Sequence, residues 1–460
     1  MKSLPSRRGA MTAGVAAALS LALAACGGGS GGGATSAPAA SAEPSKSAAV
    51  QDALSKPAEL TFWTWVTGIE KTVARFQAKY PNIKINVVNA GQSADQYTKL
   101  QTAIKAGSGA PDVAQIEYFA LPQFALSKQV VNLSEYGAAA LKDKFAASAW
   151  NQVAVNGGVY GIPQDTGPMA MFYRKDIFDK LKLEPPKTWA EFTEAAKKIK
   201  ADNPDNFITS IDPGDAGGVD SLIWQAGGKP FKTSGDSNVS VTLDSDPGVK
   251  QWVGTFNTLL SEKLVDPQPG WTDEWWKAMD AGKYAVWMTG AWAPNGIMNS
   301  IPKTKGKWAV APMPQYDAAK PMNAENGGSS VAVIPQSKNI PAAVAFAEWL
   351  NSDPEAVKSL NEEAGLFPAT KVLLDDPAFR DASVEFFGGQ KINQVLSDAS
   401  AAVAPGWQYL PFQVYANSIF KDTVGQAIDG GGDLAAALKT WQDRITTFGT
   451  EQGFTLSNGG

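Results

Sequence analysis

Apolar residues beyond position 59 follow two spacings that alternate along the chain. Runs rich in aromatic and β-branched residues at 60–65, 83–88 and 111–116 predict strands. Between them, apolar side chains recur every three or four residues over 69–80 and 97–104, which predicts helices. Strands that alternate with helices make a βαβ series. The pattern therefore predicts an α/β fold built on doubly wound, mainly parallel sheets.

The ends of these strands indicate where a ligand would lie, because open α/β sheets bind ligands beyond the carboxyl ends of their strands. Trp65 ends the first strand, Thr67 follows it, and Glu117 follows the third strand. Gln92, in the loop after the second strand, offers an amide to a polar ligand. We expect these residues near a binding cleft. Trp65 would pack equally well beneath it, and Glu117 would serve equally well as a solvated loop acid.

Two polar, glycine-rich stretches interrupt the pattern farther along. The first, at 161–167, precedes a predicted strand at 169–173. The second begins at Glu325 and reaches Gly328, where a backbone without Cβ atoms would let a ligand come close. Trp224 lies in a predicted helix that starts after a glycine turn, where it would either stack on a ligand or pack in the core.

The N-terminus has the pattern of an export signal. Basic residues precede an apolar segment that ends at Leu23-Ala24-Ala25-Cys26 and is too short to span a bilayer, which needs about 20 residues. The segment resembles a bacterial lipoprotein signal, which makes Cys26 the lipidated first residue of the mature protein. The alternatives are an ordinary cleaved signal with a chance cysteine and, from Arg7-Arg8, twin-arginine export. Residues 27–58 are rich in Gly, Ala, Ser and Pro and predict a flexible tether.

The composition excludes several classes of function. The chain has no histidine, and Cys26 is its single cysteine, which excludes Ser-His and Cys-His catalysis and cysteine-based metal sites. The net charge of −5 and the absence of a basic run argue against a nucleic-acid partner. About 400 residues follow the tether, more than one core usually holds, so two lobes are expected. Fifteen tryptophans and no histidine favour a carbohydrate over a metal ion as ligand, and we expect no cofactor.

Four motifs in order resemble family 1 extracellular solute-binding proteins, the group that includes maltodextrin-binding proteins. The first is the opening strand and helix at 60–80, and the second is the Ala-Gly-Ser-Gly-Ala-Pro-Asp-Val turn at 106–113. The third is the Tyr-Gly-Ile-Pro segment with the strand after it, at 160–178, and the fourth is the segment 279–292, which ends in Gly-Ala-Trp. Arg174 departs from the family, which usually has Asn there, at a position we expect to be unimportant for binding. The resemblance implies two hinged α/β lobes. Their expected bounds are 59–163 plus 325–372 for lobe 1, 168–320 plus 375–460 for lobe 2, and 164–167, 321–324 and 373–374 for the crossings.

A sugar ring offers an apolar face and a rim of hydroxyls, so a sugar site needs flat aromatics and polar acceptors. The resemblance puts a stacking tryptophan at Trp292, a sugar-binding acid at Asp165 and a further aromatic at Trp407. The alternatives to ligand binding are a core position for Trp292 and a turn-forming role for Asp165. The expected ligand-binding residues are Trp292, Asp165, Trp65, Thr67, Glu117, Trp407, Trp224, Gln92, Glu325 and Gly328.

The resemblance also implies a function. It predicts a monomeric protein, anchored by the lipid on Cys26 to the outer face of the plasma membrane, that delivers a sugar or small oligosaccharide to the permease subunits of an ABC transporter. A ligand-presenting sensor and a binder of a polyol or polyamine remain alternatives. No pair of acids forms a recognisable glycosidase motif, so we predict that the protein is not an enzyme.

Overall fold

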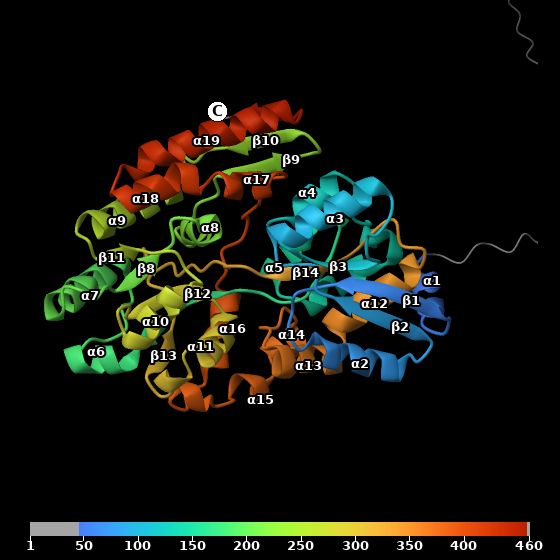
Figure 1. The fold of residues 1–460 in the computed structure, drawn as a ribbon, viewed down its shortest axis with the longest axis horizontal. Helices are drawn as coiled ribbons and strands as arrows, with labels where there is room; N and C mark the ends of the chain where they lie inside the picture. Colours follow the sequence, from blue (N-terminus) through green and yellow to red (C-terminus); the bar gives the residue numbers. More distant parts are fainter. Residues whose placement is uncertain (1–45, 458–460) are drawn as a thin grey trace, which may run out of the picture. The chain divides into compact units, whose positions relative to one another are not determined.

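The computed structural model describes residues 46–457 (Figure 1). The predicted signal peptide, Cys26 and residues 27–45 of the predicted tether lie outside the described residues. The remainder of the tether differs from the prediction, because Lys46–Ala53 form helix α1. Val50 is buried, and α1 packs against α12 (Ile340–Ser352). The average composition of residues 27–58 did not indicate the short apolar face of α1, which α12 covers.

Lobe 1 is built on a five-stranded sheet in the order β2-β1-β3-β14-β6. β1 pairs in parallel with β2 and β3, as the βαβ series predicts, whereas β14 runs antiparallel to both of its neighbours. Figure 1 shows α2 and α13 on one face of this sheet and α3 and α4 on the other. The strands are β1 (Ala58–Trp63), β2 (Ile83–Val88), β3 (Val113–Glu117), β6 (Ile162–Pro163) and β14 (Ser329–Val333), beside the small hairpin β4 (Ala154–Val155) and β5 (Gly158–Val159). The other helices are α2 (Ile69–Lys79), α3 (Ala94–Ala106), α4 (Leu121–Leu126), α5 (Ala147–Val153) and α13 (Pro354–Ala364).

Lobe 2 confirms the strand predicted at 169–173 but not the predicted parallel pairing. Its central strands, in the order β12-β7-β13, are antiparallel, and parallel pairing occurs between β8 and β11 and between β10 and β15. The prediction of a mainly parallel sheet is wrong here, because apolar spacing identifies a strand without identifying its distant partner. The strands are β7 (Met169–Arg174), β8 (Thr209–Ile211), β9 (Phe231–Ser234), β10 (Asn238–Val241), β11 (Val265–Pro267), β12 (Val286–Gly290), β13 (Trp308–Ala311) and β15 (Thr455–Ser457).

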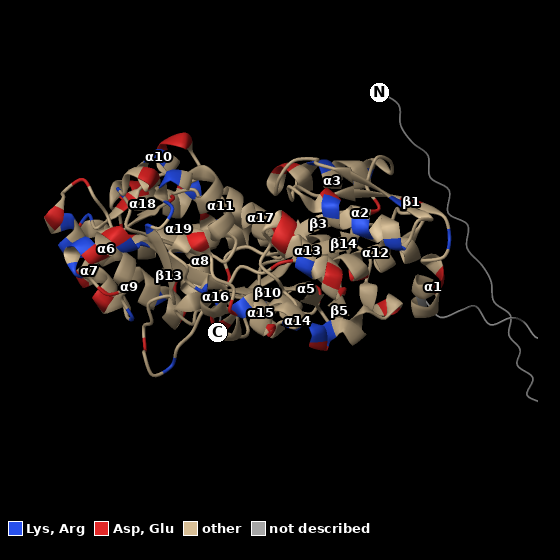
Figure 2. Cartoon of the chain, turned by 90° about the horizontal axis from the view of Figure 1, so that it is seen from below, with Lys and Arg blue, Asp and Glu red and all other residues tan. Residues whose placement is uncertain are grey.

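Helices surround these strands, and charged residues of both signs are mixed along their outer surfaces (Figure 2). They are α6 (Lys175–Leu181), α7 (Trp189–Asp202), α8 (Ala216–Gln225), α9 (Pro247–Ser261), α10 (Asp273–Ala281), α11 (Ala293–Ser300), α14 (Lys371–Leu374), α15 (Pro377–Arg380), α16 (Ile392–Ala401), α17 (Gln413–Ser418), α18 (Gln426–Gly430) and α19 (Leu434–Glu451). Over the described residues, no helix combines the length and the apolar character that crossing a bilayer requires.

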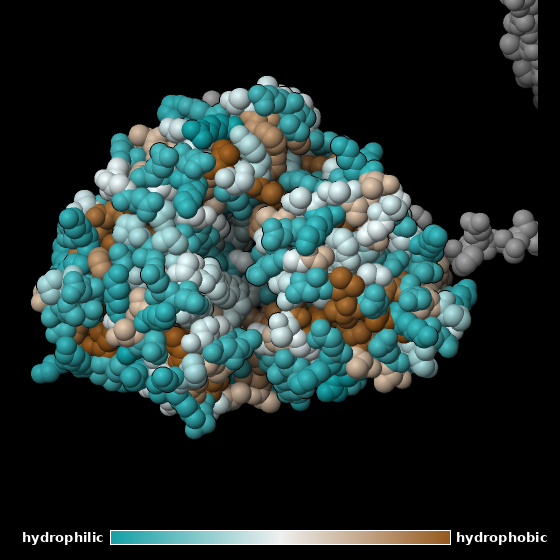
Figure 3. Space-filling model, viewed as in Figure 1, coloured by the Kyte–Doolittle hydropathy of each residue, from teal (hydrophilic) through white to brown (hydrophobic). Residues whose placement is uncertain are grey.

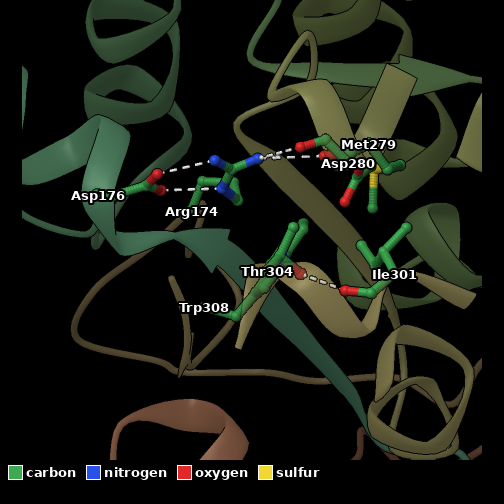
Figure 4. Close-up of polar contacts among 7 residues, drawn as sticks. All are labelled: Arg174, Asp176, Met279, Asp280, Ile301, Thr304 and Trp308. Carbon is green, nitrogen blue, oxygen red and sulfur yellow. Dashed lines mark hydrogen bonds and ion pairs between the residues drawn. The ribbon is translucent and has the colours of Figure 1, made fainter. Parts of the chain in front are cut away.

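Arg174 ties the layers of lobe 2 together at the end of β7 (Figure 4). Its guanidinium is buried and donates two hydrogen bonds to the Asp176 carboxylate, at 2.8 and 2.7 Å, and one to the Met279 carbonyl at 3.1 Å. It also lies 5.8 Å from the ring centre of Trp308, whose indole N–H donates to Thr304. Arg174 lines none of the cavities described below, so its contacts support a structural role.

Three segments join the lobes. In the first, Thr166 donates its hydroxyl to the Glu325 carboxylate of the second at 2.9 Å, and its amide to Phe367 of the third at 3.1 Å. Ala324 belongs to the core of lobe 2, whereas Ala369 belongs to the core of lobe 1. We therefore propose that the second and third crossings lie at 325–328 and 367–370, a few residues away from the predicted positions.

Candidate functional site

Two adjoining cavities form a cleft at the crossings. The larger, of about 430 Å³, is lined mainly by lobe 2, and the smaller, of about 270 Å³, is lined by both lobes. Gly214, Asp215 and Asn326 line both cavities, so they form one continuous site. Figure 3 shows the molecular surface hollowed between the two bodies. A cleft of this size at a lobe boundary is the usual place and shape of a small-molecule site.

Tryptophans form one wall of the larger cavity. Trp271, Trp275, Trp287 and Trp292 line it together. The ring centre of Trp292 lies 5.3 Å from that of Trp271 and 5.5 Å from that of Trp287. The Trp292 indole N–H donates to the Asn326 carbonyl at 2.8 Å, which links the end of β12 to the second crossing and sets the plane of the ring. Packed and hydrogen-bonded indoles make a rigid apolar surface that keeps its shape without a ligand.

Carboxylates line the same cavity as the tryptophans. Asp212, at the turn before α8, accepts hydrogen bonds from the amides of Gly214 and Gly270, at 2.7 and 2.8 Å. Asp215 caps α8 by accepting from the Gly218 amide at 2.8 Å. Both side chains line the larger cavity, and their backbone contacts hold them in place as acceptors.

Two further acids line the smaller cavity. Glu117 accepts a hydrogen bond from the Tyr97 hydroxyl at 2.8 Å, and burial raises its pKa. Asp220 is 1% exposed; one carboxylate oxygen accepts from Gln413 at 3.0 Å, and the other has no protein partner. Burial raises the pKa of Asp220 well above its usual value. No Lys or Arg is among the residues that line either cavity. The cleft therefore favours hydrogen-bond donors and cations over anions.

Asp165 and Glu325, both predicted to bind ligand, lie in the hinge instead. The Asp165 carboxylate accepts from the Ser329 amide at 2.8 Å, and its carbonyl accepts from the Tyr118 hydroxyl at 2.8 Å. Burial raises the pKa of both acids to about 7. Neither acid lines either cavity of the cleft, so their contacts join the crossings to one another.

Glycine is required where the crossings meet. A Cβ on Gly167 would lie 2.0 Å from the Asn326 carbonyl oxygen, and a Cβ on Gly328 would lie 2.6 Å from the Tyr118 ring. Gly328 also has a φ of +103°, which side chains rarely adopt. The group that approaches Gly328 closely is the Tyr118 ring. Gly328 also lines the smaller cavity, and its predicted close approach to a ligand stays a prediction.

Two of the other predicted residues line the cleft, three lie outside it near the surface or against Tyr97, and two are buried in lobe 2. Trp292 and Glu117 line the cleft, as predicted. Thr67 and Gln92 are exposed, and Trp65 packs edge-on against Tyr97; these three line neither cavity.

Trp224 and Trp407 do not belong to the cleft, which corrects the prediction. They stack on each other in the core of lobe 2, with ring centres 5.3 Å apart and planes inclined by 8°. Trp224 is 2% exposed and donates to the Ala404 carbonyl at 2.7 Å. Trp407 is 4% exposed and borders a separate cavity of about 240 Å³. Local pattern could not assign these rings to the core, because each is covered by residues that are distant in the sequence.

Sequence reasoning missed several residues that line the cleft. Trp271 is not among the predicted binding residues, although its Gly270 neighbour indicates a loop. Asp212 and Asp215 flank a Pro-Gly pair just before a helix, which signals a turn at a strand's carboxyl end. Asp220 carried no signal, because an acid inside a helical segment usually faces solvent.

Comparison with known proteins agrees with this arrangement. Residues 64–357 match the family described as bacterial extracellular solute-binding protein. An arabinooligosaccharide-binding protein of Halalkalibacterium halodurans is 26% identical over 398 residues, which cover 83% of this chain and 88% of that protein. A lactose-binding protein of Rhizobium radiobacter is 27% identical over 358 residues, 74% of this chain and 81% of that protein.

Solved structures extend the likeness to the fold. The ABC transporter associated binding protein from B. animalis subsp. lactis Bl-04, in complex with beta-1,6-galactobiose, is 41% identical with a TM-score of 0.78, covering 87% of this chain and 100% of that chain. The galacto-N-biose-/lacto-N-biose I-binding protein from Bifidobacterium longum, in complex with lacto-N-biose, is 28% identical with a TM-score of 0.76, covering 87% of this chain and 99% of that chain. The two-lobed α/β architecture and the long match confirm the resemblance: this chain belongs to the bacterial extracellular solute-binding protein family.

Proposed function

We propose that this protein binds a neutral sugar or short oligosaccharide between its lobes and delivers it to the permease of an ABC importer. One observation carries the proposal: four tryptophans and four carboxylates line the same cleft, with no basic side chain among its lining residues. The C–H face of a sugar ring fits an indole, and its hydroxyls donate to carboxylates through short, strong hydrogen bonds.

The similar proteins support the ligand class. Their names and complexes refer to an arabinooligosaccharide, lactose, beta-1,6-galactobiose and lacto-N-biose, each built from two or more sugar units. None of these sugars carries a negative charge, which agrees with the electrostatics of this cleft. Catalysis is not part of the proposal, because a binding protein needs only acceptors and stacking surfaces.

Delivery requires that the permease distinguish the ligand-bound protein from the ligand-free protein. Ser93 and Glu117 reach the smaller cavity from lobe 1, while Asp215 and Asp220 reach it from lobe 2. A sugar that contacts both sets at once binds the closed arrangement more tightly, so it shifts the lobes toward closure. The permease then recognises the closed form. Anchoring through Cys26 would keep this form at the membrane surface, and the Cys26→Ala variant should be released into the medium.

A second candidate ligand is a polyamine. The carboxylates of Glu117, Asp212, Asp215 and Asp220 also complement ammonium groups, and tryptophan faces attract cations. The stacking surface of four indoles favours the sugar, because an aliphatic polyamine has no flat face to place on it.

A thermal-shift screen followed by calorimetry tests the proposal. The panel contains neutral di- and trisaccharides of galactose, glucose and arabinose, uronic-acid disaccharides, and spermidine. A ligand at 100 times its Kd adds about 2.7 kcal/mol of stability, which is readily seen as a higher Tm. We expect shifts with at least one neutral sugar and none with the acidic sugars. A shift with spermidine alone, or with an acidic sugar at equal strength, would refute the proposed function.

A further inference from the structure

An open groove adjoins the cleft on the outer side of Trp271. It has a volume of about 700 Å³ and runs between α10 and the loop after α11. Trp271 lines both this groove and the larger cavity of the cleft, so its indole stands where the two meet. The residues lining the groove are Trp271, Asp273, Trp276, Lys277, Asp280, Asn299, Ser300, Ile301, Pro302 and Lys303.

The conformation and exposure of Trp271 are both energetically unfavourable. It is 59% exposed, and among the described residues the other large exposed hydrophobic is Val372. Its φ of +63° lies in the left-handed region, which bulky side chains seldom occupy. Ring contacts with Trp275, Trp276 and Trp292, at 6.2, 5.9 and 5.3 Å between centres, keep the indole in place. A strained and exposed aromatic at the mouth of a cleft indicates a functional surface.

The groove has the chemistry of a sugar-binding surface. Trp276 is partly exposed, and the far end of its indole rests against Gly296 of α11, where a Cβ would lie 3.6 Å from the ring. Asp273, Asn299 and Lys303 place an acceptor, an amide and a donor around it. An indole surrounded by exposed donors and acceptors of both signs suits a neutral polyhydroxyl chain better than an apolar or a strongly charged partner.

We propose that this groove holds the sugar units of an oligosaccharide that extend beyond the cleft, with the chain leaving over Trp271 and lying on Trp276. The inference rests on the proposed function and adds ligand length to it. Trp271 lines both the cleft and the groove, so a chain bound in the cleft would pass over this indole to reach Trp276. The protein is therefore suited to oligosaccharides longer than those that the cleft holds, with affinity rising when the chain reaches Trp276.

Calorimetry with a size series tests this inference. The probes are di-, tri-, tetra- and pentasaccharides of β-1,6-linked galactose, β-1,4-linked galactose and α-1,4-linked glucose, titrated into the wild-type protein. For the series whose disaccharide binds, we expect Kd to fall by about tenfold or more between the disaccharide and the tetrasaccharide, as for one added aromatic contact. A Kd that is independent of length would overturn the inference.

Two variants assign the gain to the groove. Trp276→Ala should abolish most of the length-dependent gain. Because Trp276 also packs against Trp271 and Trp275, the disaccharide Kd should rise too, but by less than the tetrasaccharide Kd. Asn299→Ala changes an exposed groove residue with little effect on folding and should reduce the gain in part. A Trp276→Ala loss that is equal for short and long sugars would overturn the inference, because it would reflect a distorted cleft. If the wild-type protein binds no sugar of any length, the proposed function fails; if it binds the disaccharide with no gain from length, only the groove fails.

Discussion

Replacing Trp292 with alanine tests the physical basis of the proposed site. Trp292 lies between β12 and α11; its indole lines the larger cavity and is held by its 2.8 Å hydrogen bond to Asn326. If the sugar face and the indole together lose about 80 Å² of apolar surface to water, about 25 cal/mol per Å² gives about 2 kcal/mol. That energy corresponds to a rise in Kd of about thirtyfold. Loss of the ring also frees the Asn326 carbonyl, so the effect on the cleft extends to the second crossing.

Calorimetry at 25 °C with the tightest sugar of the panel provides the measurement. Trp292→Phe keeps a flat ring but loses the N–H donor, so its Kd should lie between those of the wild type and Trp292→Ala. Trp63→Ala is the matched control, because Trp63 is a partly buried tryptophan on β1 that lines neither cavity of the cleft. Its Kd should stay within about twofold of the wild type. An unchanged Kd for Trp292→Ala, with an unchanged Tm, would show that the indole does not contact the sugar.

Three further predictions concern the hinge and lobe 2. The pKa values of Asp165 and Glu325 are about 7 in the folded chain and about 4 in the unfolded chain. Between these pH values the folded state binds more protons than the unfolded state. The free energy of unfolding should therefore fall as pH rises from about 4 to about 7. Asp165→Asn combined with Glu325→Gln should flatten that slope in urea titrations, and an unaltered slope would contradict the assignment. Arg174→Met removes the contacts to Asp176 and Met279 and should lower the free energy of unfolding by about 2–3 kcal/mol with sugar Kd unchanged; a change in Kd without loss of stability would argue against a structural role. Gly167→Ala places a Cβ 2.0 Å from the Asn326 oxygen and should lower both stability and sugar affinity, whereas Gly254→Ala, on α9 with open space around it, should lower neither.

The amino-acid sequence by itself determined the local elements and the class of protein. Apolar spacing identified β1, β2, β3, α2 and α3 of lobe 1, and four ordered motifs indicated the family that the comparisons confirm. Trp292, Glu117 and Gly328 could be predicted in the cleft because each follows a strand or lies in a glycine-rich crossing, positions that α/β topology brings to one edge. Their contact with a sugar stays a prediction.

Only the tertiary structure decided which tryptophans face the cleft. Trp224 and Trp407 are 183 positions apart in the sequence, yet each covers the other's ring in the core. Trp271 remains exposed because four other indoles pack around it and, within residues 46–457, no segment covers the rest of its ring. Spacing along a chain reports the period of one element, whereas burial depends on which distant elements meet. For the same reason, the directions of the strands in lobe 2 and the burial of Asp220 could not be predicted from local pattern.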